Sequence, residues 1–381
     1  MPRCALSPNL LGMIEAAAPT ADGGAPQAPA PPASLQRIAP ATVAATRAIF
    51  AAIQQARCVL VTSEPYPDGD AVGAEIALHH IAEHAFRCGA AARGEERPAG
   101  RVYLVNEKGC PRKYRFLAGS GRIRTLDSVL ERDFDLGIVV DGGVERTGAV
   151  QALFEACPRK IYIDHHKFGS RAQYDLVLAD PNASSTTQLL WTFVADPEIG
   201  VPLGRELAEA IYLGLIYDTG SFQYSLTQPL THEIAARLIE TGLDFAPIHE
   251  HALLCQEFEE LLVLGQVLAQ AQRSPCGRIV WSSASRELIE RNHVRGEDLG
   301  RIIQTLCFTE GIEVAILFRE EGPGRYKLSL RSRGRIDVGA VARALDPHGG
   351  GHDRAAGCTL TGPLAEVTAR AVGYVRALLD G

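Results

Sequence analysis

A chain of 381 residues is longer than one hydrophobic core usually spans, so its length predicts two domains with a cleft between them. The formal net charge of -7 excludes a protein that coats long nucleic acid, because such binding needs many lysines and arginines, but it leaves room for a short anionic substrate. The nine cysteines include no Cys-x-x-Cys pair, which argues against a disulfide framework or a cysteine zinc site and favours a reducing, cytoplasmic setting.

The N-terminal region predicts neither a secretory signal nor a membrane anchor. Glu15 and Asp22 interrupt the stretch where a signal peptide needs an apolar core, and no later segment runs about 18 apolar residues without a charge. From about residue 7 to residue 40 the chain is rich in alanine, proline and glycine, a composition that buries too little apolar surface to fold. We therefore expect residues 1–40 to be a disordered leader of a cytoplasmic protein with no membrane partner.

The next segments alternate between helix and strand patterns. Apolar residues recur at helical spacing from residue 41, and a compact apolar run then fits a buried strand. Further β-branched runs are separated by segments long enough to hold helices, as parallel strands require. The four strand runs are 58–61, 102–105, 136–140 and 161–163. Residues 41–230 are therefore predicted to form an α/β domain with a parallel, doubly wound sheet.

A helical segment and a smaller domain follow. Residues 231–272 are rich in alanine, leucine, glutamate and glutamine, which predicts a helical connector. Beyond it, strand patterns occupy 279–281, 313–318 and 326–330, and helical patterns occupy 299–307 and 364–379. This mixture predicts a smaller α+β domain over residues 273–381.

Ionisable side chains follow three of the predicted strands at the point where each strand ends. They are Glu64, Asp68 and Asp70 after the first strand, Asp141 after the third, and Asp164, His165 and His166 after the fourth. Because the carboxyl ends of parallel strands form the ligand-binding crevice, we expect these groups to converge. Convergent carboxylates raise one another's pKa unless a cation lies between them. Carboxylate and imidazole ligands suit Mn²⁺ or Mg²⁺, with zinc as an alternative.

Each motif also has an ordinary structural explanation. The segment 68–70 fits a turn and a helix N-cap, and 141–143 fits a turn. The adjacent histidines 165 and 166 fit a structural pair. One metal centre explains all three motifs together, and this favours the metal centre.

Five motifs resemble, in order and spacing, those of the DHH superfamily of phosphoesterases. They are residues 67–73; Asp141 with Arg146 and Gly148; Asp164-His165-His166; residues 217–222; and the C-terminal Gly349-Gly350-Gly351-His352 with Ala355-Ala356-Gly357. The last motif resembles the signature of the DHH-associated substrate domain. The branch that the chain resembles contains bifunctional oligoribonucleases, or nanoRNases, which also remove the 3′-phosphate of adenosine 3′,5′-bisphosphate. Related members cleave linear or cyclic dinucleotides.

The resemblance implies a two-metal hydrolase and a role for each matching residue. Asp68 and Asp141 would hold the first metal, and Asp70, Asp141, His165 and Asp218 would hold the second, with Asp141 between them. The catalytic group would also include His166, which would contact the scissile phosphate, and Asp164, which would orient a ligand histidine. Two ions about 3.5–4 Å apart support in-line displacement at phosphorus. Manganese is the preferred ion, with magnesium or cobalt as alternatives.

Glu64 and Asp218 are unusual among these acids, one for its residue type and the other for its position. Where the family pattern usually has a histidine ligand, this chain has Glu64, and because glutamate can also supply an oxygen ligand we keep Glu64 as a metal ligand. Asp218 ends a helical run at 207–217, where a carboxylate opposes the helix dipole. An acid in that position is easier to understand beside a cation.

The C-terminal domain carries the predicted substrate contacts. Residues 319–335 are strongly basic, and their ordinary explanation is a solvated edge strand. The glycines that follow allow close approach of backbone to a ligand, and arginine grips phosphate through paired donors. The substrate-binding candidates are Arg331, Ser332, Gly349, Gly350, Gly351, His352 and Arg354. The resemblance implies that this domain captures the non-scissile end of a short RNA or small nucleotide, which selects short substrates.

Several alternatives stay open. Within the superfamily, an inorganic pyrophosphatase would lack the glycine-histidine signature, and a single-strand exonuclease would normally be larger. Outside enzymology, the chain could be a nucleotide-binding regulator whose metal site has decayed, with Glu64 as the first sign. The sequence does not decide between oligoribonucleotide, adenosine 3′,5′-bisphosphate and dinucleotide substrates, nor the cleavage polarity or the oligomeric state, for which a homodimer is one option.

Overall fold

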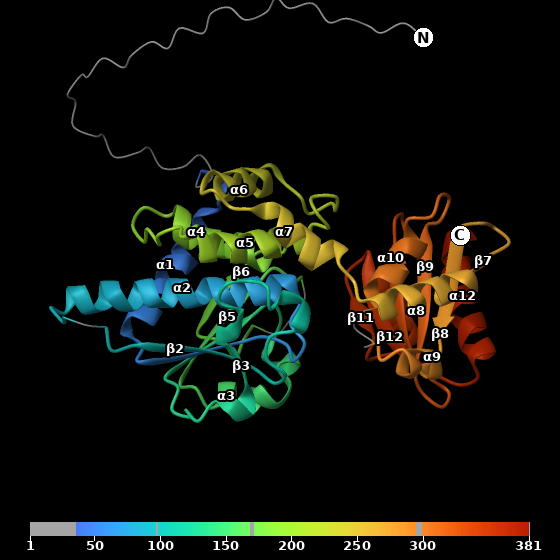
Figure 1. The fold of residues 1–381 in the computed structure, drawn as a ribbon, viewed down its shortest axis with the longest axis horizontal. Helices are drawn as coiled ribbons and strands as arrows, with labels where there is room; N and C mark the ends of the chain where they lie inside the picture. The colour runs from blue at the N-terminus through green and yellow to red at the C-terminus, as the bar shows by residue number, and fades with distance from the viewer. Residues whose placement is uncertain (1–35, 97, 168–170, 295–298, 381) are drawn as a thin grey trace, which may run out of the picture. The chain divides into compact units, whose positions relative to one another are not determined.

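The computed structural model describes residues 36–96, 98–167, 171–294 and 299–380 (Figure 1). Most of the predicted leader therefore lies outside the described residues. The chain divides into two compact units between Leu253 and Leu254. The predicted connector is divided by this boundary, because Ile234 and Leu238 pack in the core of the first unit and Val263 and Val267 in a core of the second. The domain limits at 230 and 273 stay predictions.

The first unit is built on a six-stranded parallel sheet with the order β3-β2-β1-β4-β5-β6. Its strands are β1 (Cys58–Thr62), β2 (Arg101–Asn106), β3 (Ile123–Thr125), β4 (Leu136–Val140), β5 (Arg159–Asp164) and β6 (Leu176–Ala179). The two central strands, β1 and β4, are buried along their whole length, as expected of parallel strands covered on both faces. The prediction of a parallel α/β domain is confirmed. The short strands β3 and β6 were not predicted.

Helices cover both faces of this sheet. They are α1 (Pro40–Gln55), α2 (Gly69–Ala92), α3 (Gln151–Glu155), α4 (Thr186–Ala195), α5 (Arg205–Asp218), α6 (Pro229–Glu240) and α7 (Phe245–His249), followed by a π-helical turn (Glu250–Leu254). Alternate strand residues face opposite ways: Val59 and Val61 pack with α1, α2, α4 and α5, whereas Leu60 packs with Phe154 of α3. Figure 1 shows α3 on the other side of the sheet from α2.

Helices α2 and α5 cross unusually closely because glycines stand at the crossing. A Cβ on Gly73 would lie 2.3 Å from the backbone oxygen of Ala210, and one on Gly214 would lie 2.2 Å from Oδ1 of Asp70. A side chain at Gly73 would collide with the backbone of α5, and one at Gly214 would displace the Asp70 carboxylate and the Thr187 side chain. The crossing therefore sets how closely the first turn of α2 approaches the last turn of α5.

The second unit is a smaller α+β domain, which confirms that prediction. Its six-stranded mixed sheet has the order β11-β12-β10-β9-β8-β7, in which β8 and β9 are parallel and the other pairs are antiparallel. The strands are β7 (Gln272–Arg273), β8 (Ile279–Ala284), β9 (Val314–Gly322), β10 (Arg325–Ser332), β11 (Gly350–Gly351) and β12 (Ala355–Thr361). The helices are α8 (Phe258–Ala269), α9 (Arg286–Arg291), α10 (Gly300–Cys307), α11 (Val338–Leu345) and α12 (Leu364–Asp380).

The sheet of the second unit separates two apolar cores. One core contains residues of α11 and α12, and the other contains residues of α8 and α10. The sequence did not predict α11 or β12. In the described part of the chain, no helix combines the length and apolarity needed to cross a bilayer.

Candidate metal centre

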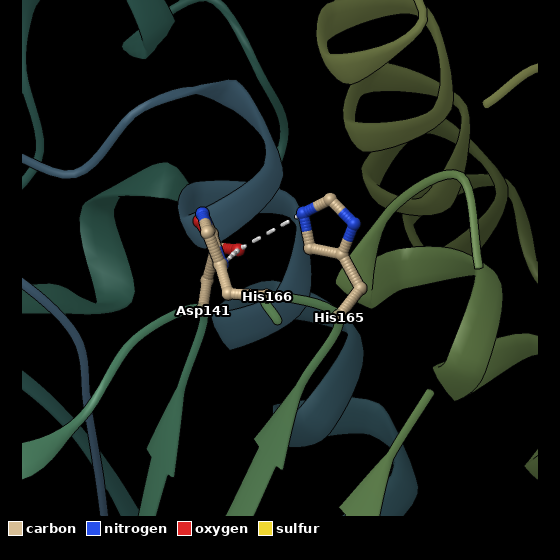
Figure 2. Close-up of side chains that lie close together, drawn as sticks. All are labelled: Asp141, His165 and His166. Atoms are coloured by element: carbon tan, nitrogen blue, oxygen red, sulfur yellow. Dashed lines mark ion pairs between the residues drawn. The ribbon is translucent and has the colours of Figure 1, made fainter. Parts of the chain in front are cut away.

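Part of the set of side chains predicted from the strand ends meets above the middle of the first sheet, together with Asp218 of α5. β1 and β4 are neighbours at the point where the strand order reverses, which is where ligands bind in open α/β sheets. The structure brings together Asp70, Asp141, His165 and Asp218, whose candidate ligand atoms all lie within 4.8 Å of one another. Asp141, His165 and His166 form a second, overlapping group. Figure 2 shows both imidazoles beside Asp141, whose Oδ1 lies 3.8 Å from His165 Nε2 and 3.7 Å from His166 Nδ1.

Asp70 is fixed in the first turn of α2 by the start of α4. Its Oδ2 accepts a hydrogen bond from the backbone N–H of Thr186 at 2.5 Å, and its Oδ1 accepts one from Thr187 at 3.0 Å. Both donors are in the first turn of a helix, where free N–H groups and the helix dipole favour an anion. Asp70 is fully buried, and the missing side chain at Gly214 leaves the room that its carboxylate occupies.

Asp141 lies where β4 ends and adopts a left-handed backbone, with φ of 54°. This conformation is costly for a residue with a side chain, although aspartate tolerates it better than most, and such strain is concentrated at functional sites. The Thr186 hydroxyl donates to Asp141 Oδ1 at 3.0 Å. Burial, followed by the charges of Asp68 and Asp70, raises the pKa of Asp141 well above its usual range. Without a cation, Asp141 is therefore held in an unfavourable environment as an anion.

His165 and Asp218 form a buried pair. His165 Nε2 lies 2.8 Å from Asp218 Oδ2, and its Nδ1 lies 3.2 Å from the backbone oxygen of Ala183. Because Nδ1 must donate to that carbonyl, Nε2 is the nitrogen available to a ligand on the carboxylate side. Burial alone would lower the pKa of His165, but the hydrogen bond and charge of Asp218 outweigh it and raise the pKa to about 10. Burial and the charge of Asp70 raise the pKa of Asp218 to about 7.

The donor chemistry of this group fits a divalent metal ion. Three carboxylates and one imidazole converge in a buried space, and the raised pKa values show that the carboxylates repel one another. A divalent cation would relieve that repulsion. Without a cation, the proton on His165 does so in part, as the raised pKa of His165 indicates. Oxygen-rich sites with an imidazole suit manganese and magnesium, and neither of the two groups contains a cysteine.

Glu64 and Asp68 lie outside both of these groups in the described structure. Glu64 Oε2 accepts a hydrogen bond from Arg146 Nη2 at 2.6 Å. Asp68 Oδ1 caps α2 by accepting from the backbone N–H of Asp70 at 2.9 Å and of Ala71 at 3.1 Å. The ordinary N-cap explanation for Asp68 is thus present in the structure. Metal ligation by Glu64 and Asp68 stays a prediction.

Asp164, the last residue of β5, holds His166. Its Oδ1 accepts hydrogen bonds from His166, at 3.0 Å from the backbone nitrogen and 2.6 Å from Nδ1, and its Oδ2 accepts one from the Tyr162 hydroxyl. Tyr162 and Asp164 are two positions apart on β5, so they share one face of the sheet and His165 points to the other. Asp164 thus contacts His166 and not His165, and because His166 belongs to one of the two candidate ligand groups, the role of Asp164 in orienting a ligand histidine stays a prediction. His166 outweighs the effect of burial and lowers the pKa of Asp164 to about 2.

In the second unit the predicted substrate residues gather at one end of the sheet. Arg331 pairs with Ala355 across β10 and β12, the backbone N–H of Ser332 donates to the oxygen of Arg354 at 3.0 Å, and that of His352 donates to Ala355 at 2.8 Å. Gly350 and Gly351 form β11 beside β12. β10 lies between β9 and β12, so the explanation of this basic segment as an edge strand was wrong.

The glycines of this loop are needed for its packing against α11. A Cβ on Gly349 would lie 2.4 Å from the backbone oxygen of Ala342, and Gly351 has φ of 132°. The loop therefore lies directly on the helix, and its outer atoms face away from the core. Its contacts with a substrate stay a prediction.

Two side chains that hold the acids in place, those of Thr186 and Tyr162, were not predicted from the sequence. Thr186 contacts both Asp70 and Asp141, and Tyr162 contacts Asp164. A signal for Thr186 was present, because the serines and threonines at 184–187 are typical of a helix start and Ser185 is the N-cap of α4.

Comparisons with known proteins agree with this architecture. Residues 58–215 match the DHH family, N-terminal domain, and residues 284–379 match the DHHA1 domain. The bifunctional oligoribonuclease and PAP phosphatase NrnA of Thermus thermophilus is 26% identical over 310 residues, covering 80% of this chain and 84% of that protein. The cyclic-di-AMP phosphodiesterase GdpP of Geobacillus thermodenitrificans is 24% identical over 297 residues, covering 77% of this chain and 43% of that protein.

One solved structure shows the same fold over most of the chain. An exopolyphosphatase-related protein from Bacteroides fragilis superposes with a TM-score of 0.76 at 23% identity, covering 90% of this chain and 99% of that one. At this identity the likeness concerns the fold.

Proposed function

This chain belongs to the DHH family of phosphoesterases, with a DHHA1 domain after the DHH domain, and we propose that it hydrolyses short oligoribonucleotides, adenosine 3′,5′-bisphosphate or both. The observation that carries the proposal is the convergence of Asp70, Asp141, His165 and Asp218 from four separate segments. The relative named as an oligoribonuclease and PAP phosphatase, aligned over most of both chains, supports this substrate class.

The proposed metal ligands are Glu64, Asp68, Asp70, Asp141, His165 and Asp218. Two divalent ions held by these groups, manganese by preference, would neutralise the phosphoryl oxygens and lower the pKa of an attacking water. Asp141 is the residue that both proposed ligand sets share. The donor set supports at least one ion, because four of the six groups lie within 4.8 Å of one another.

His166 is proposed to act on the phosphate. Asp164 accepts its Nδ1 proton, so Nε2 is turned away from Asp164 and can face a substrate. The low pKa of Asp164 keeps this partner ionised at neutral pH, so that it continues to accept from Nδ1. Through Nε2, His166 would contact a phosphoryl oxygen or carry a proton to the leaving oxygen.

The DHHA1 domain is proposed to bind the part of the substrate that is not cleaved. Arg331, Ser332, Gly349, Gly350, Gly351, His352 and Arg354 are the proposed contacts. Their grouping at one end of the second sheet supports this: Gly351 and His352 lie against the start of α11 close to Gly339, and Arg331 and Ser332 lie on β10 beside Ala355 and Arg354. A domain that holds one end of a substrate restricts turnover to short chains.

A second candidate is hydrolysis of linear or cyclic dinucleotides. The relative named as a cyclic-di-AMP phosphodiesterase supports it, although this chain spans less than half of that protein. A non-catalytic regulator with a decayed metal site is the remaining alternative, and it predicts nucleotide binding without turnover.

One substrate panel separates these functions. Adenosine 3′,5′-bisphosphate, RNAs of two to five nucleotides, a 24-nucleotide RNA, linear pApA and cyclic di-AMP are compared by kcat/KM with Mn²⁺, Mg²⁺ and Co²⁺. We expect the highest values for adenosine bisphosphate or di- to tetranucleotides with Mn²⁺. A preference for cyclic di-AMP would establish the second candidate, and binding without turnover under all three metals would establish the regulator.

A further inference from the structure

The loop after β2 brings positive charge and a hydrogen-bond donor to the acidic centre, and neither belongs to the DHH motifs. Residues Arg112–Tyr114 form a short helical turn, η2, beyond the carboxyl end of β2, the strand beside β1. Three of the four residues at 112–115 are basic, in a chain whose net charge is -7. The carboxyl ends of β1, β2 and β4 lie on the same edge of the sheet, so this loop shares that edge with the acids.

Tyr114 is buried beside Tyr217, the residue that precedes Asp218. Its side chain is fully buried, and its ring packs edge-on against Tyr217 with centroids 6.3 Å apart. Burial, followed by the charges of Tyr217 and Asp68, raises the pKa of Tyr114 well above its usual range, and the Tyr217 hydroxyl lies close enough to interact with it. Nevertheless, within the described residues this hydroxyl has no partner at hydrogen-bond geometry. A buried donor without a partner is unfavourable, so its presence beside the metal centre requires a reason.

Lys113 is exposed, and its position is set by the same two rings. Its Nζ lies 4.8 Å from the ring centroid of Tyr114 and 5.5 Å from that of Tyr217, both within cation–π range. Tyr217 immediately precedes Asp218, and its ring packs on Gly69, where a Cβ would lie 2.7 Å from Tyr217 Cγ. The ammonium is therefore held over a ring that lies between the two segments carrying Asp68, Asp70 and Asp218.

Resting on the proposed function, we infer that Lys113 and Tyr114 bind the scissile phosphate: the Lys113 ammonium contacts its non-bridging oxygens, and the Tyr114 hydroxyl donates to the same anion. A phosphate entering a centre that already holds the carboxylates of Asp70, Asp141 and Asp218 meets repulsion, which a cation at the rim offsets. Lysine binds phosphate as a point charge, and because burial raises the pKa of Tyr114, its phenol stays protonated and can donate at neutral pH.

Lys113→Met tests the charge, because methionine keeps an unbranched apolar stem over the rings. We expect KM to rise about tenfold to a hundredfold for adenosine 3′,5′-bisphosphate, for dinucleotides and for bis(p-nitrophenyl) phosphate alike, since all three present a scissile phosphate. The inhibition constant of inorganic phosphate should rise by a similar factor. Lys113→Arg, which keeps the positive charge, should recover most of the lost affinity. The matched control is Lys160→Met, which removes a lysine at the start of β5, the opposite edge of the sheet.

Tyr114→Phe tests the hydroxyl with the ring retained. Because the hydroxyl has no partner, its removal should leave Tm unchanged or raised, while kcat/KM falls severalfold on the same three substrates. A purely structural tyrosine would give the reverse, a lower Tm with unchanged kcat/KM, and that result would overturn the assignment of Tyr114.

Measurements on the wild-type protein distinguish a failure of this inference from a failure of the proposed function. No wild-type turnover on the substrate panel means that the proposed function fails. Wild-type turnover with an unchanged KM and phosphate inhibition constant in Lys113→Met means that the inference about Lys113 fails alone. A loss confined to substrates with a terminal phosphate would also overturn it, because the contact would then be with another phosphate.

Discussion

The two groups of proposed site residues differ in how the protein holds them. In the first unit Asp70, Asp141 and His165 are buried and held from behind by hydrogen bonds. In the second unit the residues of the glycine loop are mostly half-buried or exposed, and their shape is set by backbone pairing with β12. Buried charges are unfavourable without a counterion, whereas charges at a surface are solvated. Metal binding should therefore raise the stability of the first unit, because it relieves repulsion between buried carboxylates. Substrate binding by the second unit relieves no such repulsion.

The largest expected effect comes from removing the charge at the residue shared by both proposed ligand sets. Asp141→Asn should reduce turnover by about a thousandfold or more and lower the bound metal, because the proposed ions lose a common ligand. Asparagine is preferred to alanine, since it tolerates the left-handed backbone. Relief of carboxylate repulsion should also raise the Tm of the metal-free protein. Activity and metal content are measured together. Near-normal turnover would rule out a metal centre in which Asp141 is a shared ligand.

A smaller effect, confined to longer substrates, is expected in the second unit. Arg331→Ala and His352→Ala should reduce kcat/KM on di- to tetranucleotides about tenfold to a hundredfold, the value of a lost charged contact of roughly 1.5–3 kcal/mol. Hydrolysis of bis(p-nitrophenyl) phosphate and the metal content should change little, because these residues are not proposed to reach the metals. Equal losses on both substrates would remove the functional difference between the two regions.

Glu64 tests where the metal centre ends. If Glu64 is a ligand, Glu64→Ala should raise the Mn²⁺ concentration needed for half-maximal activity about tenfold. Glu64→His should recover activity with a changed metal preference. The control is Arg146→Met, which breaks the 2.6 Å ion pair but leaves the carboxylate in place. An unchanged metal-activation curve in Glu64→Ala would show that Glu64 only pairs with Arg146.

The smallest expected effect is a pH dependence of a few degrees in Tm. In the folded state the pKa of His165 is raised to about 10 and that of Asp218 to about 7, both above their unfolded values. The metal-free fold therefore loses stability as pH rises from the unfolded values toward these raised values. Protons also compete with metal for these groups. The Tm gain produced by a fixed Mn²⁺ concentration should therefore grow between pH 5 and pH 9, as measured by thermal unfolding with Mn²⁺ or with EDTA. A gain that shrinks with pH would contradict this pairing.

The sequence predicted the parts of the fold that have a strong local pattern. β1 and β4 are continuous apolar runs, and the acids after them were predicted to converge because parallel strands end at one edge. β3 has three residues and β6 has four, too few for a periodic signal. α11 was not predicted because it has only 8 residues and contains Gly339, so its apolar pattern is too short to indicate a helix.

The side-chain partners were harder to predict than the elements. Convergence of Asp70 with Asp141 followed from the common end of the parallel strands, and that of Asp218 was implied by the family resemblance, but the partner of Asp164 depends on which face of β5 each residue occupies. Lys113 and Tyr114 carry no motif, and their relation to Tyr217 exists only in three dimensions. The domain limits, the ligand roles of Glu64 and Asp68, and the substrate contacts of the second unit stay predictions.

The glycines at the crossing of α2 and α5 also constrain how this protein can evolve. Any substitution at Gly73 or Gly214 introduces a Cβ, which would collide with the Ala210 backbone or with the Asp70 carboxylate. Substitutions at these two positions consequently cannot change the distance between the acids gradually. Adaptation to a larger or smaller ion would have to use other positions at the edge of the site, such as residue 64, while the helix crossing stays unchanged.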